Sequence, residues 1–266
     1  MKKLLFILLS LTLGIAWGDA FEDGAVAYNN RDYTAAIKIW RPLADTGHAK
    51  AQYNLSLIYD NGQGVSQDFK EAVKWYRLAA EQGYASAQNN LGVKYDNGQG
   101  VPQDFKEAVK WYRLAAEQGI VSAQFNLGYM YYNGQGVPQD FKEAVKWYRL
   151  AAEQGHALAQ FNLGGVYDKG RGVAKDYKEA VRWYKLAAEQ GDVDAQYNLG
   201  YMYAKGQGVL QDYIYAHMWF NLASMRGDTV FATKNRDFLA KLMTPQQIEK
   251  AQEMAKSCQA RNFKGC

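Results

Sequence analysis

A stretch of 19 residues, VPQDFKEAVKWYRLAAEQG, occurs at 101–119 and again without change at 137–155. Related copies run over 65–83 and 173–191, so the step from one copy to the next is always 36 residues. A fixed internal period of this length is typical of stacked repeats, in which each unit contacts only its neighbours. The sequence therefore predicts a repeat array and not a single globular core.

Five full units follow one another over 47–226, and each begins with a glycine. In the first of these units Ala51, Leu55 and Tyr59 are four residues apart, which is the spacing of one face of a helix. The second half of the unit also has its apolar residues at helical spacing, so each unit should be a pair of helices. The inward residues of that second helix are Ala72, Trp75, Tyr76 and Ala79.

The connection between the two helices of a unit is a segment such as NGQGV, or KGRGV in the fourth unit, with two glycines two residues apart. We expect both glycines to have positive φ in a tight turn. Asp68 should cap the second helix, and Gly83 stands at a natural position for its end. Ser56 becomes glycine in the later units, which should let the two helices of a pair approach closely.

These residues together form the pattern AxAQYNLGxxYxxGxGVxxDxxxAxxWYxxAAxxG, which resembles the Sel-one-like repeat (SLR), a relative of the tetratricopeptide repeat. The pattern recurs five times over 47–226, and residues 21–46 are similar to a divergent first repeat. The resemblance implies an all-α fold, a right-handed α-solenoid superhelix of antiparallel helix pairs with a 36-residue period. It also implies a scaffold that binds proteins, and it supplies no catalytic residue.

The two ends of the array differ from its middle. In the last unit Ile214 and Met218 replace lysines of the outward face, so we expect residues 227–266 to cover that face as a helical cap. Residues 228–241 can form one helix, and Thr244 followed by Pro245 marks the start of another. Cys258 and Cys266 are close in sequence and are predicted to form a disulfide, with two free thiols as the alternative.

Residues 1–20, MKKLLFILLSLTLGIAWGDA, are typical of a cleaved signal peptide. Two lysines precede an apolar run that is too short for a membrane span, and cleavage is expected after Gly18 or after Ala20. The alternative is an uncleaved anchor. The expected location is periplasmic or secreted, with no integral membrane segment after cleavage.

The sequence offers little support for catalysis or for binding of a metal, a cofactor or nucleic acid. The net charge of +4 is too small to favour nucleic acid, and the three histidines lack the spacing of metal ligands, so we expect no metal, no cofactor and no nucleic-acid partner. A cysteine-rich bacterial branch of the family is credited with binding or slowly hydrolysing β-lactams, but its repeats each carry a cysteine pair. This chain has no cysteine between residues 1 and 257, so a non-enzyme is predicted.

A polar and aromatic stripe on the first helices is the predicted binding surface, because first helices line the concave side of such a solenoid. Amide side chains suit an extended peptide backbone, and aromatic rings supply anchors. The alternative is that both groups make contacts between repeats. The predicted partner-binding residues are Asn54, Asn90, Asn126, Asn162, Asn198, Tyr53, Phe125, Phe161, Tyr197, Tyr129 and Tyr201.

Rows of cations such as Lys70, Lys74 and Arg77 recur on the second helices and suggest weak contact with anionic envelope material, although nearby glutamates should offset their charge. The sequence thus predicts an exported, non-catalytic scaffold that binds a protein or peptide, in a bacterial cell envelope. A secreted factor that acts on a host protein is the second hypothesis, and a weak β-lactam-binding or β-lactam-hydrolysing enzyme is the third.

Overall fold

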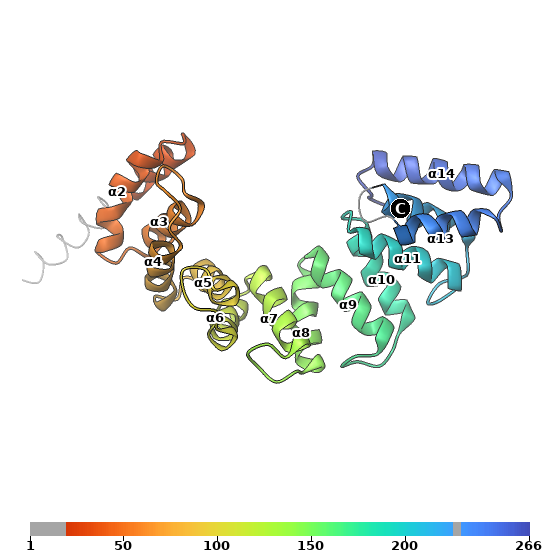
Figure 1. Ribbon diagram of the computed structural model, residues 1–266, viewed down its shortest axis with the longest axis horizontal. Coiled ribbons are helices and arrows are strands. Elements are labelled where there is room, and N and C mark those ends of the chain that lie inside the picture. Colours follow the sequence, from red (N-terminus) through yellow and green to blue (C-terminus); the bar gives the residue numbers. More distant parts are fainter. Residues whose placement is uncertain (1–19, 226–229) are drawn as a thin grey trace, which may run out of the picture. The chain divides into compact units, whose positions relative to one another are not determined.

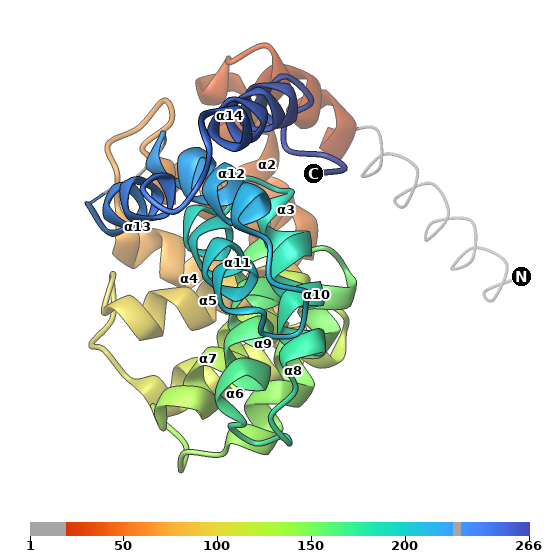
Figure 2. The same ribbon diagram turned by 90° about the vertical axis from the view of Figure 1, so that its right-hand side faces the viewer.

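The computed structural model describes residues 20–225 and 230–266, and the predicted signal peptide therefore lies almost wholly outside the described residues. Residues 20–29 are helical, and further helices follow in chain order, as labelled in Figure 1 and, for α12, in Figure 2. No strand occurs in the described part of the chain. The labelled helices are α2 (Tyr33–Asp45), α3 (Ala49–Asn61), α4 (Phe69–Glu81), α5 (Ala85–Asn97), α6 (Phe105–Glu117), α7 (Val121–Asn133), α8 (Phe141–Glu153), α9 (Ala157–Lys169), α10 (Tyr177–Ala188), α11 (Val193–Lys205), α12 (Tyr213–Ser224), α13 (Val230–Ala240) and α14 (Pro245–Ala260).

The chain forms two compact units. Of the described residues, the first unit takes 20–123 and 135–137, and the second takes 124–134, 138–225 and 230–266. Within the first unit α2, α3, α4, α5 and α6 pack consecutively, each on the next, and within the second unit α8 to α12 do the same (Figure 2). This chain of neighbour contacts confirms the predicted all-α solenoid of helix pairs.

The cap of α4 and the turn before it are where the sequence predicts them. The Asp68 carboxylate accepts hydrogen bonds from the backbone N–H groups of Lys70 and Glu71, at 2.9 and 3.0 Å, and so satisfies two donors at the start of α4. Gly62 ends α3 in the left-handed conformation with φ of 66°, and Gly64 follows with φ of 70°. The predicted positive φ at both glycines of the turn is confirmed.

Glycines also set how closely helices approach. A Cβ on Gly164 would lie 2.7 Å from the ring of Tyr184, which confirms that the small residue lets the two helices of a pair meet closely. The second glycine of each turn has a further role that the sequence did not reveal. A Cβ on Gly172 would lie 2.4 Å from the backbone of Phe141, which begins the second helix of the preceding pair.

Buried glutamines join successive helix pairs. The Gln160 side chain donates to the carbonyl of Ala152 at 3.0 Å and accepts from Gln190 at 2.8 Å. Gln88 makes the same two contacts in the first unit, with Ala80 and Gln118. Both glutamines are buried, so these hydrogen bonds keep their amide groups paired away from water and join one helix pair to the next. This explains the glutamine in the repeated AQ, to which sequence reasoning gave no role.

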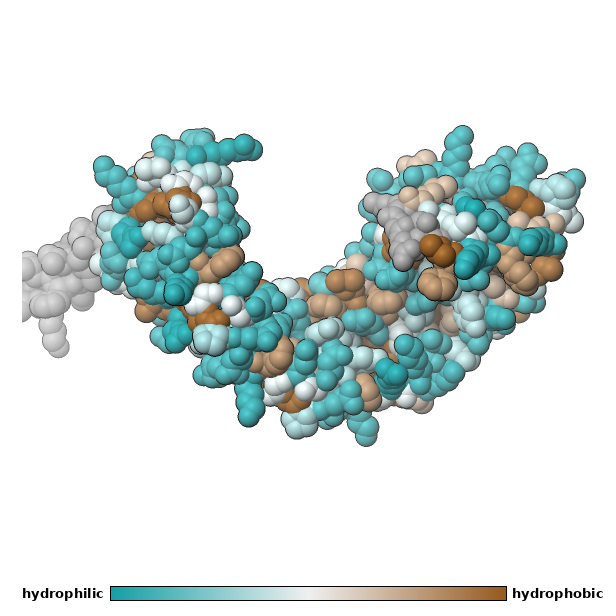
Figure 3. Space-filling model, in the orientation of Figure 1, coloured by the Kyte–Doolittle hydropathy of each residue, from teal (hydrophilic) through white to brown (hydrophobic). Residues whose placement is uncertain are grey.

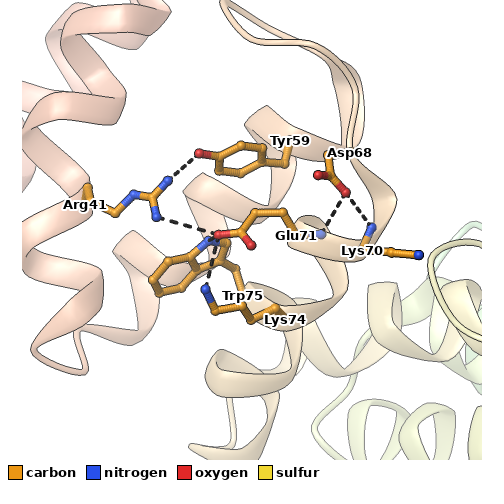
Figure 4. Close-up of polar contacts among 7 residues, drawn as sticks. All are labelled: Arg41, Tyr59, Asp68, Lys70, Glu71, Lys74 and Trp75. Atoms are coloured by element: carbon orange, nitrogen blue, oxygen red, sulfur yellow. Dashed lines mark hydrogen bonds and ion pairs between the residues drawn. The ribbon is translucent and has the colours of Figure 1, made fainter.

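Arginines of the outer face link pairs in another way (Figure 4). The guanidinium of Arg41 in α2 donates to the Tyr59 hydroxyl and pairs with Glu71 at 3.6 Å. The same Glu71 carboxylate accepts from the Trp75 indole at 2.8 Å and pairs with Lys74 at 3.3 Å. Arg41 therefore joins neighbouring repeats, while Lys74 pairs locally with glutamate as predicted.

The last helices cover the end of the array. Met218 of α12 is 1% exposed, and Ile214 packs in a cluster with residues of α13 and α14. Thr244 and Gln247 form a reciprocal capping box at the start of α14. Residues of α13 and α14 thus pack over the apolar outer face of the last unit. Part of α13 stays open, because Phe231 and Phe238 are exposed, and Figure 3 shows hydrophobic residues there.

The cysteines at the end of the chain form the predicted bond. Cys258, near the end of α14, is bonded to Cys266, and their Cα atoms lie 5.6 Å apart. Phe263 inside this loop has a φ of 65°, and its side chain is buried, so the loop folds back onto the cap.

Candidate binding surface

The predicted asparagine ladder is largely engaged inside the protein. The Asn90 amide donates to the Tyr76 hydroxyl of the preceding helix at 3.3 Å. Burial raises the pKa of Tyr148, and a hydrogen bond from Asn162 opposes that rise. Burial likewise raises the pKa of Tyr184, and a hydrogen bond from Asn198 opposes that rise. These three contacts favour the alternative in which the asparagines connect repeats, while Asn54 and Asn126 are half-buried on the same face.

Four of the predicted aromatic residues also pack between helices. Phe125 stacks on His156 with ring centroids 4.7 Å apart, and Phe161 lies 5.9 Å from the Tyr184 ring. Tyr53 contacts Tyr76 and Tyr84, and Tyr197 contacts Phe220. All four side chains are half-buried, so part of their apolar area packs within the array and only the remainder can contact a partner.

Tyr129 and Tyr201 differ from the others because they are 46% and 43% exposed. They occupy the same position in α7 and α11, two repeats apart. The corresponding position in α9, the helix between them, is Gly165. The two tyrosines are therefore the predicted residues that offer the most free aromatic surface.

The missing side chain at Gly165 leaves a pocket of about 250 Å³ in the second unit. Four predicted residues, Tyr129, Phe161, Asn162 and Asn198, line it. Sequence reasoning missed the others. The signal for them was available, because glycine stands in α9 where the other first helices have Leu57, Val93, Tyr129 and Tyr201. The remaining lining residues are Tyr132, Asn133, Tyr148, Gly165, Asp168, Lys169 and Tyr184.

The histidines have structural roles. Nδ1 of His48 accepts a hydrogen bond from the backbone of Ala51 at 3.2 Å, and Nδ1 of His156 accepts one from Ala159 at 3.3 Å. Both residues are therefore N-caps, of α3 and α9. Asp192 caps α11 from the same position of its repeat. His217 is buried in α12, where burial is the larger cause of its lowered pKa and the Arg236 charge adds to it.

Replacing His156 by asparagine should weaken the pH dependence of stability below neutrality. Burial lowers the pKa of His156 below its usual value near 6.5, so the unfolded chain takes up a proton before the folded chain does. The contribution of this cap, about 1 kcal/mol, is complete above about pH 6.5 and is lost as the pH falls through the folded pKa. Asparagine keeps an acceptor and cannot titrate.

The measurement is urea unfolding at pH 7 and pH 5 for both proteins. The loss of unfolding free energy between these values should be smaller in His156→Asn than in the natural chain. Equal losses in the two proteins would show that His156 does not titrate as described. Since every other titratable group is shared, the comparison isolates His156.

No group of three or more metal-ligating side chains occurs within residues 20–225 and 230–266. None of the described helices is long and apolar enough to cross a membrane. The outer basic rows are partly neutralised. Lys110, Lys146 and Arg182 each pair with a glutamate three residues earlier, at 3.3 to 3.4 Å.

Comparison with known proteins agrees with this architecture. The model of the Sel1 repeat matches five consecutive segments, residues 49–84, 85–120, 121–156, 157–192 and 193–228. In a comparison with curated proteins, none matched.

Two solved structures are similar over most of the chain. One is c5321, described as a protective antigen present in uropathogenic Escherichia coli strains displaying an SLR fold. It is 36% identical with a TM-score of 0.82, over 93% of this chain and 54% of that one. The chain thus spans about half the length of c5321. The other is a Sel1 repeat protein from Oxalobacter formigenes, 37% identical with a TM-score of 0.75, over 89% of this chain and 96% of that one. Five matched repeats and two such neighbours show that this chain belongs to the Sel1 repeat family.

Proposed function

We propose that this protein is an exported, non-catalytic scaffold that binds a protein or peptide through the surface of its first helices, in a bacterial cell envelope. The observation that carries the proposal is the pair Tyr129 and Tyr201, exposed on either side of Gly165 in the repeat order. Most other aromatic residues of the array are buried or half-buried. Exposed tyrosines are typical of the anchors in protein interfaces, and Tyr129 also lines the pocket at Gly165.

Export has two supports. The first is the sequence of residues 1–20, with its lysines and short apolar run. The second is the Cys258–Cys266 bond, because disulfides persist in oxidising compartments. Finding only unprocessed protein in the cytoplasm would contradict this part of the proposal.

The experiment for the binding surface is site-specific photo-crosslinking in cells. A photoreactive amino acid is placed at Tyr129 or at Tyr201, and the control positions are Leu150 and Leu186 on the second helices. The controls are matched because all four side chains are partly exposed apolar or aromatic groups. Adducts with a defined protein should form at the two tyrosine positions and not at the controls. Adducts at the control positions alone would contradict binding through the first helices.

A second candidate is a secreted factor that acts on a host protein. It is favoured by the similarity to c5321, a protein described as a protective antigen of a pathogen. Identification of the crosslinked protein separates the two candidates.

The outer cations could add weak contact with anionic envelope material. A β-lactam-hydrolysing enzyme is the third candidate, and turnover of a chromogenic β-lactam that survives further purification would contradict the non-catalytic proposal.

A further inference from the structure

The pocket over Gly165 has the chemistry of a subsite for one side chain, and this inference rests on the proposed binding function. Its volume of about 250 Å³ is below the usual range for whole small-molecule ligands. The pocket exists because α9 has glycine where α7 and α11 have tyrosine. A Cβ at Gly165 would have only the Tyr184 hydroxyl nearby, at 3.6 Å, so the fold does not require glycine here.

The walls of the pocket are rich in aromatic rings. Tyr129, Tyr132, Phe161 and Tyr184 all line it. Aromatic faces attract cations that come within about 6 Å of the ring centre. One of these rings already attracts a cation of the chain itself. The guanidinium of Arg171 lies 5.8 Å from the centroid of Tyr132.

One carboxylate lines the pocket, and it is unlike its counterparts. Asp60 and Asp96 occupy the same repeat position in the first unit, and each accepts a hydrogen bond from a buried tyrosine at 3.1 Å. In the part of the chain that the structure describes, no such bond joins Tyr184 to Asp168. Burial raises the pKa of Tyr184, and the negative charge of Asp168 raises it further, so this carboxylate lies near the tyrosine hydroxyl.

Asp168 also makes no ion pair among the described side chains. The Asp168 side chain is short and half-buried, whereas the side chain of its neighbour Lys169 is long and exposed. The lysine can extend into water, while the carboxylate stays at the pocket wall. Asp168 is the one carboxylate among the residues that line the pocket, and it lies at the wall, where a cation can pair with it.

We propose that this pocket holds one arginine side chain of the protein or peptide partner. A guanidinium is planar, stacks on aromatic faces and pairs with a carboxylate through two parallel hydrogen bonds. The rings of Tyr129 and Phe161 supply the faces, and Asp168 supplies the carboxylate.

The test uses the full chain and a small probe, N-acetyl-arginine N-methylamide, followed by NMR. The Gly165 amide signal should shift with saturable dependence on the probe. The citrulline analogue has nearly the same shape without the charge, and it should bind at least fivefold more weakly. A glutamate analogue tests the opposite charge. Equal binding by citrulline, or saturable shifts with glutamate in place of arginine, would overturn the proposal.

Variants give a second, independent readout. Gly165→Tyr copies the residue of α7 and α11 and should abolish the shifts of the other pocket residues while the protein stays folded. If that variant does not fold, Gly165→Leu, which copies Leu57, replaces it. Asp168→Asn should weaken binding at least fivefold, and Lys169→Ala should not weaken it. Unchanged arginine binding in Asp168→Asn would overturn the role given to the carboxylate.

The two proposals fail in different ways. If the probe does not bind while crosslinking at Tyr129 and Tyr201 still captures a partner, the arginine subsite is wrong and the binding function stands. If the probe binds but crosslinks form only at the control positions, the pocket is correct and the proposed function is wrong.

Discussion

Replacing Trp111 by alanine should lower the free energy of unfolding by about 3–5 kcal/mol. The indole is only 8% exposed, and it packs in a cluster with Tyr76, Ala80 and Leu91 from the two preceding helices. Its N–H has no hydrogen-bond partner among the described residues, whereas the indole of Trp75 donates to Glu71. The expected loss is therefore one of packing, through the cavity that the truncation leaves.

Leu114→Ala is the matched control, because Leu114 lies on the same helix, α6, and is 39% exposed. Its cost should stay below about 1 kcal/mol. Both variants are compared by urea unfolding followed by circular dichroism. A difference of less than about 1 kcal/mol between them would mean that Trp111 does not hold the repeats together as described.

Gly172→Ala should be the most damaging of the small substitutions, with a cost of about 2–5 kcal/mol. Two effects add. Alanine is strained at a φ of 73°, and its Cβ would lie 2.4 Å from the Phe141 backbone. Backbone cannot rotate away as a flexible side chain can, so the contact between two successive helix pairs has to open.

Gly155→Ala separates these two effects. Gly155 has φ of 89°, but a Cβ there would meet nothing within 4 Å. This variant should show only the strain, about 1–2 kcal/mol, and thermal unfolding of both variants measures the difference. Equal melting temperatures for Gly155→Ala and Gly172→Ala would show that the close approach at Gly172 contributes nothing.

The binding surface shows where sequence reasoning was limited. A stripe on a helix gives the direction of a side chain but not what the next helix places against it. Asn90 and Phe125 lie on the predicted stripe, yet one bonds Tyr76 and the other stacks on His156. Tyr129 lies on the same stripe and is 46% exposed. Only the packing of neighbouring repeats distinguishes these residues.

The sequence by itself determined the helix pairs, the aspartate cap of the second helix, the glycine turns and the Cys258–Cys266 pairing. Those features depend on local chemistry or on a period that repeats five times, and both can be recognised in the sequence alone. The tertiary structure decided the rest. Contacts between repeats, such as those of Gln160, Arg41 and Gly172, join residues roughly 8 to 31 positions apart. The pocket at Gly165 exists only because five aromatic residues from four helices surround the place of one missing side chain.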